Sequence, residues 1–236
     1  MKKIITTAVF VLFTTVSANA VDFSGLSFTA GIATSTSVWG ATATETSSKE
    51  DGTADRVNKE SGAFAESYSS YFGEVGFGRF VSIGYEHTPD AISTPENINS
   101  GGVKGVSGLN GAAPGTTSKV SVDFNDLNTT YVKLNIPGGM YLKYGYVETD
   151  LDIKEVQKSG NTYNNVSIDG TSTGIGYQRL LGDSRVGFRF ETNYVEFDNA
   201  TATNGLATTA NHNKIEAKNI EGLNAKLALT ITLGNR

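Results

Sequence analysis

A two-residue alternation of apolar and polar side chains, repeated along most of the sequence, is the feature that most limits its possible folds. In GFRFETNYVEF, residues 187–197, Phe188, Phe190 and Tyr194 fall on one side of an extended chain, and Arg189 and Glu191 fall on the other. Successive side chains of a β-strand point to opposite faces of its sheet, so the pattern indicates a strand between two different environments. A helical period of 3.6 residues is nowhere sustained. The sequence therefore predicts an all-β protein.

Eight segments carry the alternation, and the connections between them alternate in length. The predicted strands lie within residues 26–40, 70–77, 80–86, 131–136, 140–148, 173–178, 187–197 and 223–233. Short turns with hairpin chemistry follow the second, fourth and sixth of them, at Gly78-Arg79, Pro137-Gly138-Gly139 and Gly182-Asp183. Long connections rich in Gly, Ser, Thr, Asn and Asp cover roughly residues 45–61, 88–117, 155–164 and 199–213. Strict alternation of short and long connections is typical of outer-membrane barrels.

A closed barrel explains why each strand has one apolar and one polar face. Every backbone N–H and C=O in a bilayer needs a partner within the protein, so a sheet crosses a membrane only when it closes on itself. The lumen of an eight-stranded barrel is just wide enough for side chains to fill it. The pattern thus predicts an eight-stranded antiparallel up-and-down transmembrane β-barrel. Its lumen would hold an ionic network of Glu74, Glu86, Lys133, Lys143, Arg189, Glu191 and Lys226, and its lipid face would include Phe188, Phe190, Tyr194, Leu227, Leu229 and Ile231.

The N-terminal segment and the composition indicate the compartment and exclude several partners. MKKIITTAVFVLFTTVSANA contains two lysines, an apolar stretch and Ala18-Asn19-Ala20, which is the pattern of a cleaved secretory signal. We therefore expect residues 1–20 to be removed and residues 21–236 to form a single barrel domain. The chain has no cysteine, which excludes disulfides and thiolate metal sites. Its net charge is −5 and no block of Lys and Arg is present, which argues against nucleic acid as a partner.

The chain resembles the small outer-membrane β-barrel superfamily, which includes OmpA-like transmembrane domains, opacity-type surface antigens and porin-like eight-stranded barrels. The segment GIGYQRLLGDSRVGFRFETNYVEFD carries the resemblance best, with a glycine-rich strand, a tight Gly-Asp turn and a strand that alternates charges with aromatics. The resemblance implies residence in the bacterial outer membrane, contact with its lipids and lipopolysaccharide, and insertion by the barrel-assembly machinery. One departure is the C-terminal strand, which places Leu229, Ile231 and Leu233 where such barrels usually end on an aromatic residue.

Several functions remain open at this level. A structural or surface-exposed barrel with a side-chain-filled lumen is the preferred interpretation, because eight strands leave little room for a channel. A narrow porin-like channel for small solutes or ions is the first alternative, with Arg189, Glu191 and Lys143 at its constriction. A soluble lipocalin-like carrier would invert the two faces and hold an apolar ligand inside. A lipid A-modifying enzyme is the least supported, because His87 and Glu86 are sequence neighbours and would point to opposite faces.

No catalytic, cofactor-binding or metal-binding residue is predicted. The sequence has no GxSxG, P-loop, dinucleotide-binding or HExxH motif. Glu148, Asp150 and Asp152 could in principle bind Ca²⁺ or Mg²⁺, but the loop after them lacks the EF-hand pattern, so a solvated strand end is expected. Trp39 is expected at the outer membrane interface, because Trp and Tyr favour that position. The same expectation, or a place as ordinary strand residues, applies to Tyr68, Tyr71, Tyr85, Tyr141, Tyr144, Tyr146, Tyr177 and Tyr194.

Overall fold

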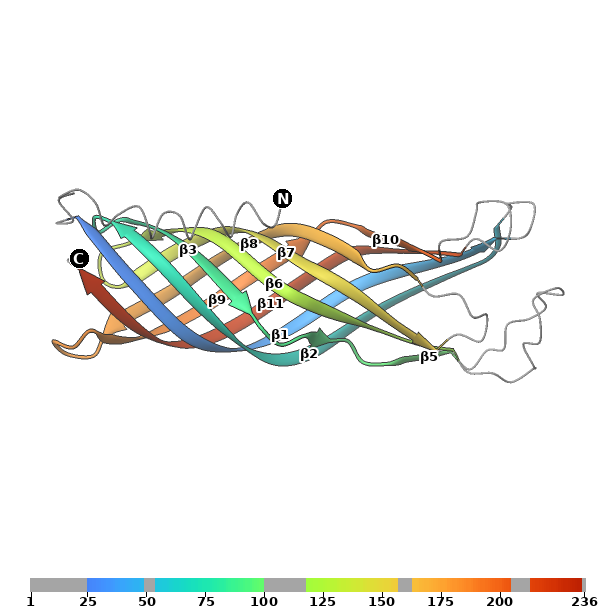
Figure 1. The fold of residues 1–236 in the computed structure, drawn as a ribbon, viewed down its shortest axis with the longest axis horizontal. Coiled ribbons are helices and arrows are strands. Elements are labelled where there is room, and N and C mark those ends of the chain that lie inside the picture. Colours follow the sequence, from blue (N-terminus) through green and yellow to red (C-terminus); the bar gives the residue numbers. More distant parts are fainter. Residues whose placement is uncertain (1–24, 49–53, 100–117, 157–162, 205–212, 235–236) are drawn as a thin grey trace, which may run out of the picture.

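The computed structural model describes residues 25–48, 54–99, 118–156, 163–204 and 213–234 as a single closed sheet (Figure 1). The predicted signal peptide, residues 1–20, lies outside the described residues. In Figure 1 the strands run obliquely across the barrel, and the start of β1 lies at the same end as the arrowhead of β11. Within the described ranges, no helix is long and apolar enough to cross a membrane.

Eight strands form the ring, which confirms the predicted architecture. Each strand pairs antiparallel with the next in the order β1-β2-β3-β6-β7-β8-β9-β11, and β11 pairs with β1 to close the barrel. Closure leaves no free sheet edge around the ring, which is what a bilayer requires of a sheet. The bounds are β1 Leu26–Ser48, β2 Ala54–Phe77, β3 Val81–Thr88, β6 Ser118–Asn135, β7 Met140–Val156, β8 Val166–Leu180, β9 Val186–Phe197 and β11 Asn213–Gly234.

Short turns join the strands at one end of the barrel, as the sequence predicted. The turn between β2 and β3 contains Gly78, whose φ is 61°, and the turn between β8 and β9 contains Gly182, whose φ is 60°. Glycine adopts such left-handed conformations without the steric cost that a side chain would add. We refer to this end as the short-turn end and to the opposite end as the long-loop end.

At the long-loop end the strands are longer than the sequence predicted, and this is a correction. Most of the segment expected to be the loop 45–61 is strand, because β1 and β2 stay paired as far as Ser48 and Ala54. Three short strands also occupy connections that were expected to be irregular: β4 Ile92–Ser93 and β5 Asn97–Asn99 pair with β6, and β10 Ala200–Thr203 pairs with β11. In the extended part of β1 and β2, hydroxyl groups pair across the strands, for example Thr42 with Ser61 at 2.9 Å. This part has no apolar face, so alternation in the sequence did not indicate a strand there.

The outer surface of the ring is apolar over its short-turn half. Five of the six residues predicted to face lipid are exposed, and Phe188 is half-buried, with its ring centroid 6.1 Å from that of Tyr177. The exposed five are Phe190, Tyr194, Leu227, Leu229 and Ile231. The six remaining ring strands also expose large apolar side chains, among them Ile32, Tyr71, Ile83, Leu134, Tyr144 and Ile175. We call these exposed apolar side chains the apolar belt. An apolar surface of this extent is suited to a hydrocarbon environment and is unusual for a surface in water.

Candidate functional site: the filled lumen

The inward positions of the ring form two stacked sets of side chains. The first set, which we call the ionic layer, lies toward the short-turn end and contains Glu74, Glu86, Lys133, Lys143, Arg189, Glu191 and Lys226, all buried. The second set, the apolar plug, lies toward the long-loop end. It contains Trp39, Tyr68, Ile92, Phe124, Leu127, Val147, Leu151, Ile168, Val195, Phe197, Ala200 and Ile220. The structure thus places all seven residues of the predicted ionic network inside the barrel.

Glu74 is the centre of one half of the ionic layer. The Arg189 guanidinium binds both of its carboxylate oxygens, with Nη1–Oε1 at 2.7 Å and Nη2–Oε2 at 2.8 Å. Lys133 Nζ donates to Glu74 Oε2 at 2.5 Å, and the Tyr131 hydroxyl donates to Oε1 at 2.8 Å. Gln178 Oε1 accepts from Arg189 at 2.8 Å and from Lys133 at 3.2 Å. Buried carboxylates are stable only with such partners, and here β6 and β9 supply them.

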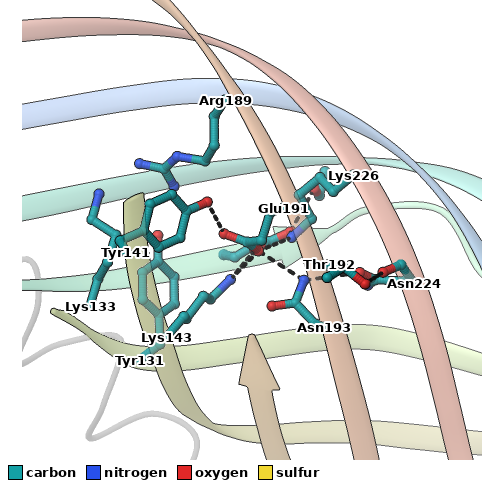
Figure 2. Close-up of polar contacts among 12 residues, drawn as sticks. Tyr131, Lys133, Tyr141, Lys143, Arg189, Glu191, Thr192, Asn193, Asn224 and Lys226 are labelled. Carbon is teal, nitrogen blue, oxygen red and sulfur yellow. Dashed lines mark hydrogen bonds and ion pairs between the residues drawn. The ribbon is translucent and has the colours of Figure 1, made fainter. Parts of the chain in front are cut away.

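The other half of the ionic layer is a four-membered ring of charges. Lys143 lies 3.0 Å from both Glu86 and Glu191, and Lys226 lies 2.5 Å from Glu86 and 3.2 Å from Glu191. Figure 2 shows Lys143, Lys226 and Glu191 of this ring. The Tyr141 hydroxyl donates to Glu191 Oε2 at 2.6 Å. Two acids and two bases alternate, so each charge faces two of the opposite sign. The four charges therefore compensate one another within the lumen.

Aromatic rings support the ionic layer from within the lumen. Lys143 Nζ lies 4.1 Å from the ring centroid of Tyr131, and the Arg189 guanidinium carbon lies 4.4 Å from that of Phe72. These cation–π contacts add attraction where water is excluded. Tyr131 and Tyr141 are each almost fully buried, so their hydroxyls reach the carboxylates from inside the barrel.

Two glycines make room for these tyrosine rings. A Cβ atom on Gly84 would lie 2.4 Å from the Tyr131 ring, and one on Gly176 would lie 2.2 Å from the Tyr141 ring. The glycine-rich face of the predicted strand 173–178 therefore has a packing role. The absence of a side chain on one strand lets a large ring from its neighbour lie flat against the wall.

Trp39 corrects a prediction. It is 3% exposed and lies inside the barrel, with its ring centroid 6.0 Å from that of Phe124 and 6.1 Å from that of Phe197. A Cβ on Gly222 would lie 2.3 Å from its ring, so the indole packs against the β11 wall. Trp39 is in phase with the inward Ser35 and Ser37, and that phase was the signal in the sequence that indicated its true position.

For Tyr68 and Tyr141 the structure favours the second of the two expectations, that of ordinary strand residues and not of interface residues. Both are buried in the lumen, where Tyr141 hydrogen-bonds Glu191 and Tyr68 accepts from Asn224 Nδ2 at 3.0 Å. Tyr71, Tyr144, Tyr146 and Tyr194 are exposed on the outer surface. Tyrosine is apolar enough for lipid and polar enough for an ionic lumen, so residue type alone did not separate the two groups.

A small cavity lies between the ionic layer and the apolar plug. Its volume is about 20 Å³, and its wall combines Trp39 and Val195 of the plug with Glu86, Lys143 and Lys226 of the ionic layer. About 10–15 Å³ is needed to hold one water molecule, so the cavity has room for about one.

The other residues considered from the sequence lie outside the lumen. His87 is on the outward side of β3, where its Nδ1 is 2.6 Å from Asn128 Oδ1, whereas the adjacent Glu86 points inward. Glu148, Asp150 and Asp152 are partly exposed along β7. Among the described residues, no group of three or more His, Asp or Glu side chains is arranged to hold a metal ion.

A salt bridge joins Asp123 of β6 to Lys154 of β7 near the long-loop end, beyond the apolar belt. Burial alone would raise the pKa of the Asp123 carboxyl, but the hydrogen bonds from Lys154 and Ser93 and the positive charge of Lys154 together hold the pKa below its ordinary value. The same hydrogen bond raises the pKa of the exposed Lys154 amine. This pair therefore joins β6 to β7 near the long-loop end.

Comparisons with known proteins identify the fold. No protein-family model matches the sequence, and the search of curated proteins finds no match. Among solved structures, the outer membrane protein OprG from Pseudomonas aeruginosa superposes with a TM-score of 0.51 at 9% identity, covering 85% of this chain and 96% of OprG. The outer membrane protein AlkL gives a TM-score of 0.49 at 11% identity, covering 92% of this chain and 95% of AlkL. Together with the closed eight-stranded ring, the likeness to OprG shows that this chain has the fold of the small outer-membrane β-barrels.

Proposed function

We propose that the protein is an integral outer-membrane β-barrel with a structural and surface-exposed role and a lumen closed by its own side chains. The barrel would be surrounded by outer-membrane lipids, with lipopolysaccharide around its long-loop half, after export and insertion by the barrel-assembly machinery. The strands that extend past the apolar belt would carry the long connections away from the membrane surface.

The observation that carries this proposal is that two different layers close the same lumen. The ionic layer joins β2, β3, β6, β7, β9 and β11 through salt bridges, and the apolar plug fills the next level with stacked rings. A water-filled pore would have to break a network of buried charges and also wet an apolar layer. Both steps are costly, because unpairing a buried charge alone costs about 3–5 kcal/mol.

A narrow channel is the second candidate, and the polar character of the ionic layer favours it. Lys143, Arg189 and Glu191 line the lumen as a constriction would. In that case the apolar plug would be the gate, since apolar constrictions close by excluding water.

The two remaining alternatives receive less support. A lipocalin-like carrier needs an apolar interior and a charged exterior, whereas this barrel has charges inside and large apolar side chains outside. A lipid A-modifying enzyme needs a catalytic histidine with an acidic partner, and the described His87 contacts Asn128 and the ring of Tyr71. We therefore propose no catalytic role.

Conductance across planar bilayers separates the first two candidates. Refolded wild-type protein should give no steady single-channel current. The variant with Trp39→Ala, Phe124→Ala and Phe197→Ala removes the stacked rings of the plug and should admit water and ions. Tyr144→Ala, an exposed aromatic on the outer surface, is the matched control and should remain silent. A steady wild-type current whose ion selectivity changes on Arg189→Ala would reject the closed barrel in favour of the channel.

A further inference from the structure

The small cavity between the ionic layer and the apolar plug is lined by two residues that each carry an unpaired polar atom. Within the described part of the chain, Trp39 Nε1 and Asn193 Oδ1 are buried and have no hydrogen-bond partner. Both residues line the cavity, and they are 3% and 2% exposed. A buried polar atom left without a partner is destabilising, so native structures rarely tolerate two beside one cavity.

The orientation of the Asn193 amide is determined by its neighbours. Its Nδ2 donates to Glu191 Oε1 at 2.8 Å and to Asn224 Oδ1 at 2.9 Å. Turning the amide by 180° would place its oxygen against a carboxylate oxygen and an amide oxygen, and all three are acceptors. The unpaired atom of Asn193 is therefore an acceptor, whereas the indole N–H of Trp39 can only donate.

A single ligand that satisfies both atoms must accept one hydrogen bond and donate another. A metal cation cannot accept from the indole, and a halide ion cannot donate to the amide oxygen. The volume of about 20 Å³ limits the occupant to about one water-sized molecule. A buried water needs two to four polar partners, and Thr88, Thr129 and Ser172 are further polar residues among those that line the cavity.

We propose that this cavity is a binding site for one ordered water molecule, which accepts from Trp39 Nε1 and donates to Asn193 Oδ1. The water links the apolar plug to the ionic layer, because Asn193 is itself bound to Glu191. It also fixes the edge of the indole that packs against both Phe124 and Phe197. The site does not depend on whether the barrel conducts ions.

The sequence provides an unusually direct probe, because Trp39 is its single tryptophan. Protein labelled with ¹⁵N-tryptophan and refolded in detergent micelles gives one indole resonance. Magnetisation transfer from water to the Trp39 Hε1 proton should then show a NOE and a ROE of opposite sign, as a long-lived water in contact requires. Absence of transfer, or NOE and ROE of the same sign as in proton exchange, would overturn the proposal.

A pair of serine variants tests the location of the water. Ser172→Thr adds a methyl group at the cavity wall and should abolish the dipolar transfer. Ser82→Thr adds the same methyl group in the lumen near the short-turn end and should preserve it, since Ser82 does not line the cavity. Transfer that persists in both variants, or disappears in both, would assign the water to another site. The wild-type result decides the presence of the water even where a variant fails to refold.

Discussion

The guanidinium of Arg189 on β9 binds both carboxylate oxygens of Glu74 on β2, a residue 115 positions earlier in the chain. The two strands are not neighbours, since β1 and β11 lie between them in the ring. Their side chains therefore meet across the lumen and connect opposite parts of the wall. A contact of this kind stabilises the closed barrel and not one hairpin.

Replacing Arg189 should test this connection most directly. Arg189→Met leaves the Glu74 carboxylate with fewer buried partners, so we expect the free energy of unfolding in urea to fall by about 3–5 kcal/mol. Arg189→Lys should lose part of that amount, because a lysine cannot bind both carboxylate oxygens in the planar two-pronged geometry. Arg185→Met, at an exposed short-turn position, is the control and should unfold as the wild type does. Equal stability of Arg189→Met and the control would mean that the ion pair contributes no stability.

The glycines under the lumen tyrosines should be intolerant of even one methyl group. Gly176→Ala forces a Cβ atom to within 2.2 Å of the Tyr141 ring, and we expect the free energy of unfolding to fall by about 1–3 kcal/mol. Gly73→Ala is the matched control, because a Cβ there meets nothing within 4 Å on a strand of the same barrel. Urea titrations followed by tryptophan fluorescence compare the two. Similar losses in both variants would contradict the close packing of Tyr141.

A charge introduced in the apolar belt should lower the stability of the barrel, whereas a charge on the same outer surface near the long-loop end should not. Leu229→Arg places a charge on the outer face at a position that is 57% exposed, and at the centre of a bilayer this costs about 2–4 kcal/mol. Val57→Arg is an equally exposed apolar-to-charged change near the long-loop end of β2 and should cost almost nothing. Unfolding in lipid vesicles measures both. If Val57→Arg proved as costly as Leu229→Arg, the hydrocarbon region would extend much further along the barrel than the belt indicates.

The closed ring should give the chain heat-modifiable migration on SDS gels. The barrel has no free edge from which its ladder can open, so the unboiled membrane form should stay folded and run faster than the boiled form. Chain kept in urea and never refolded provides the reference position of the unfolded band. A single band at that position, with or without boiling, would show that the barrel does not form in the membrane fraction.

Particular residues show how far the sequence alone could lead. Phe190 and Leu227 alternate with Arg189 and Lys226 on strands that pair directly, so period two assigned both faces correctly without any knowledge of register. Trp39 was misplaced because residue type was given more weight than phase. The outer halves of β1 and β2 were taken as loop because Thr, Ser and Glu occupy both of their faces. In that region only backbone pairing between the two strands shows that they are strands.

By itself, the sequence determined the antiparallel barrel, the number of its ring strands and which residues share each face, because each of these follows from local alternation and turn spacing. Only the tertiary structure decided which inward charges pair, that Tyr131 and Tyr141 join them, and that Trp39 packs in the lumen with Phe124 and Phe197. Those contacts depend on the stagger between strands and on closure of β11 onto β1, which bring residues more than one hundred positions apart into one layer. Alternation specifies the face of a side chain, whereas register and closure specify its partner.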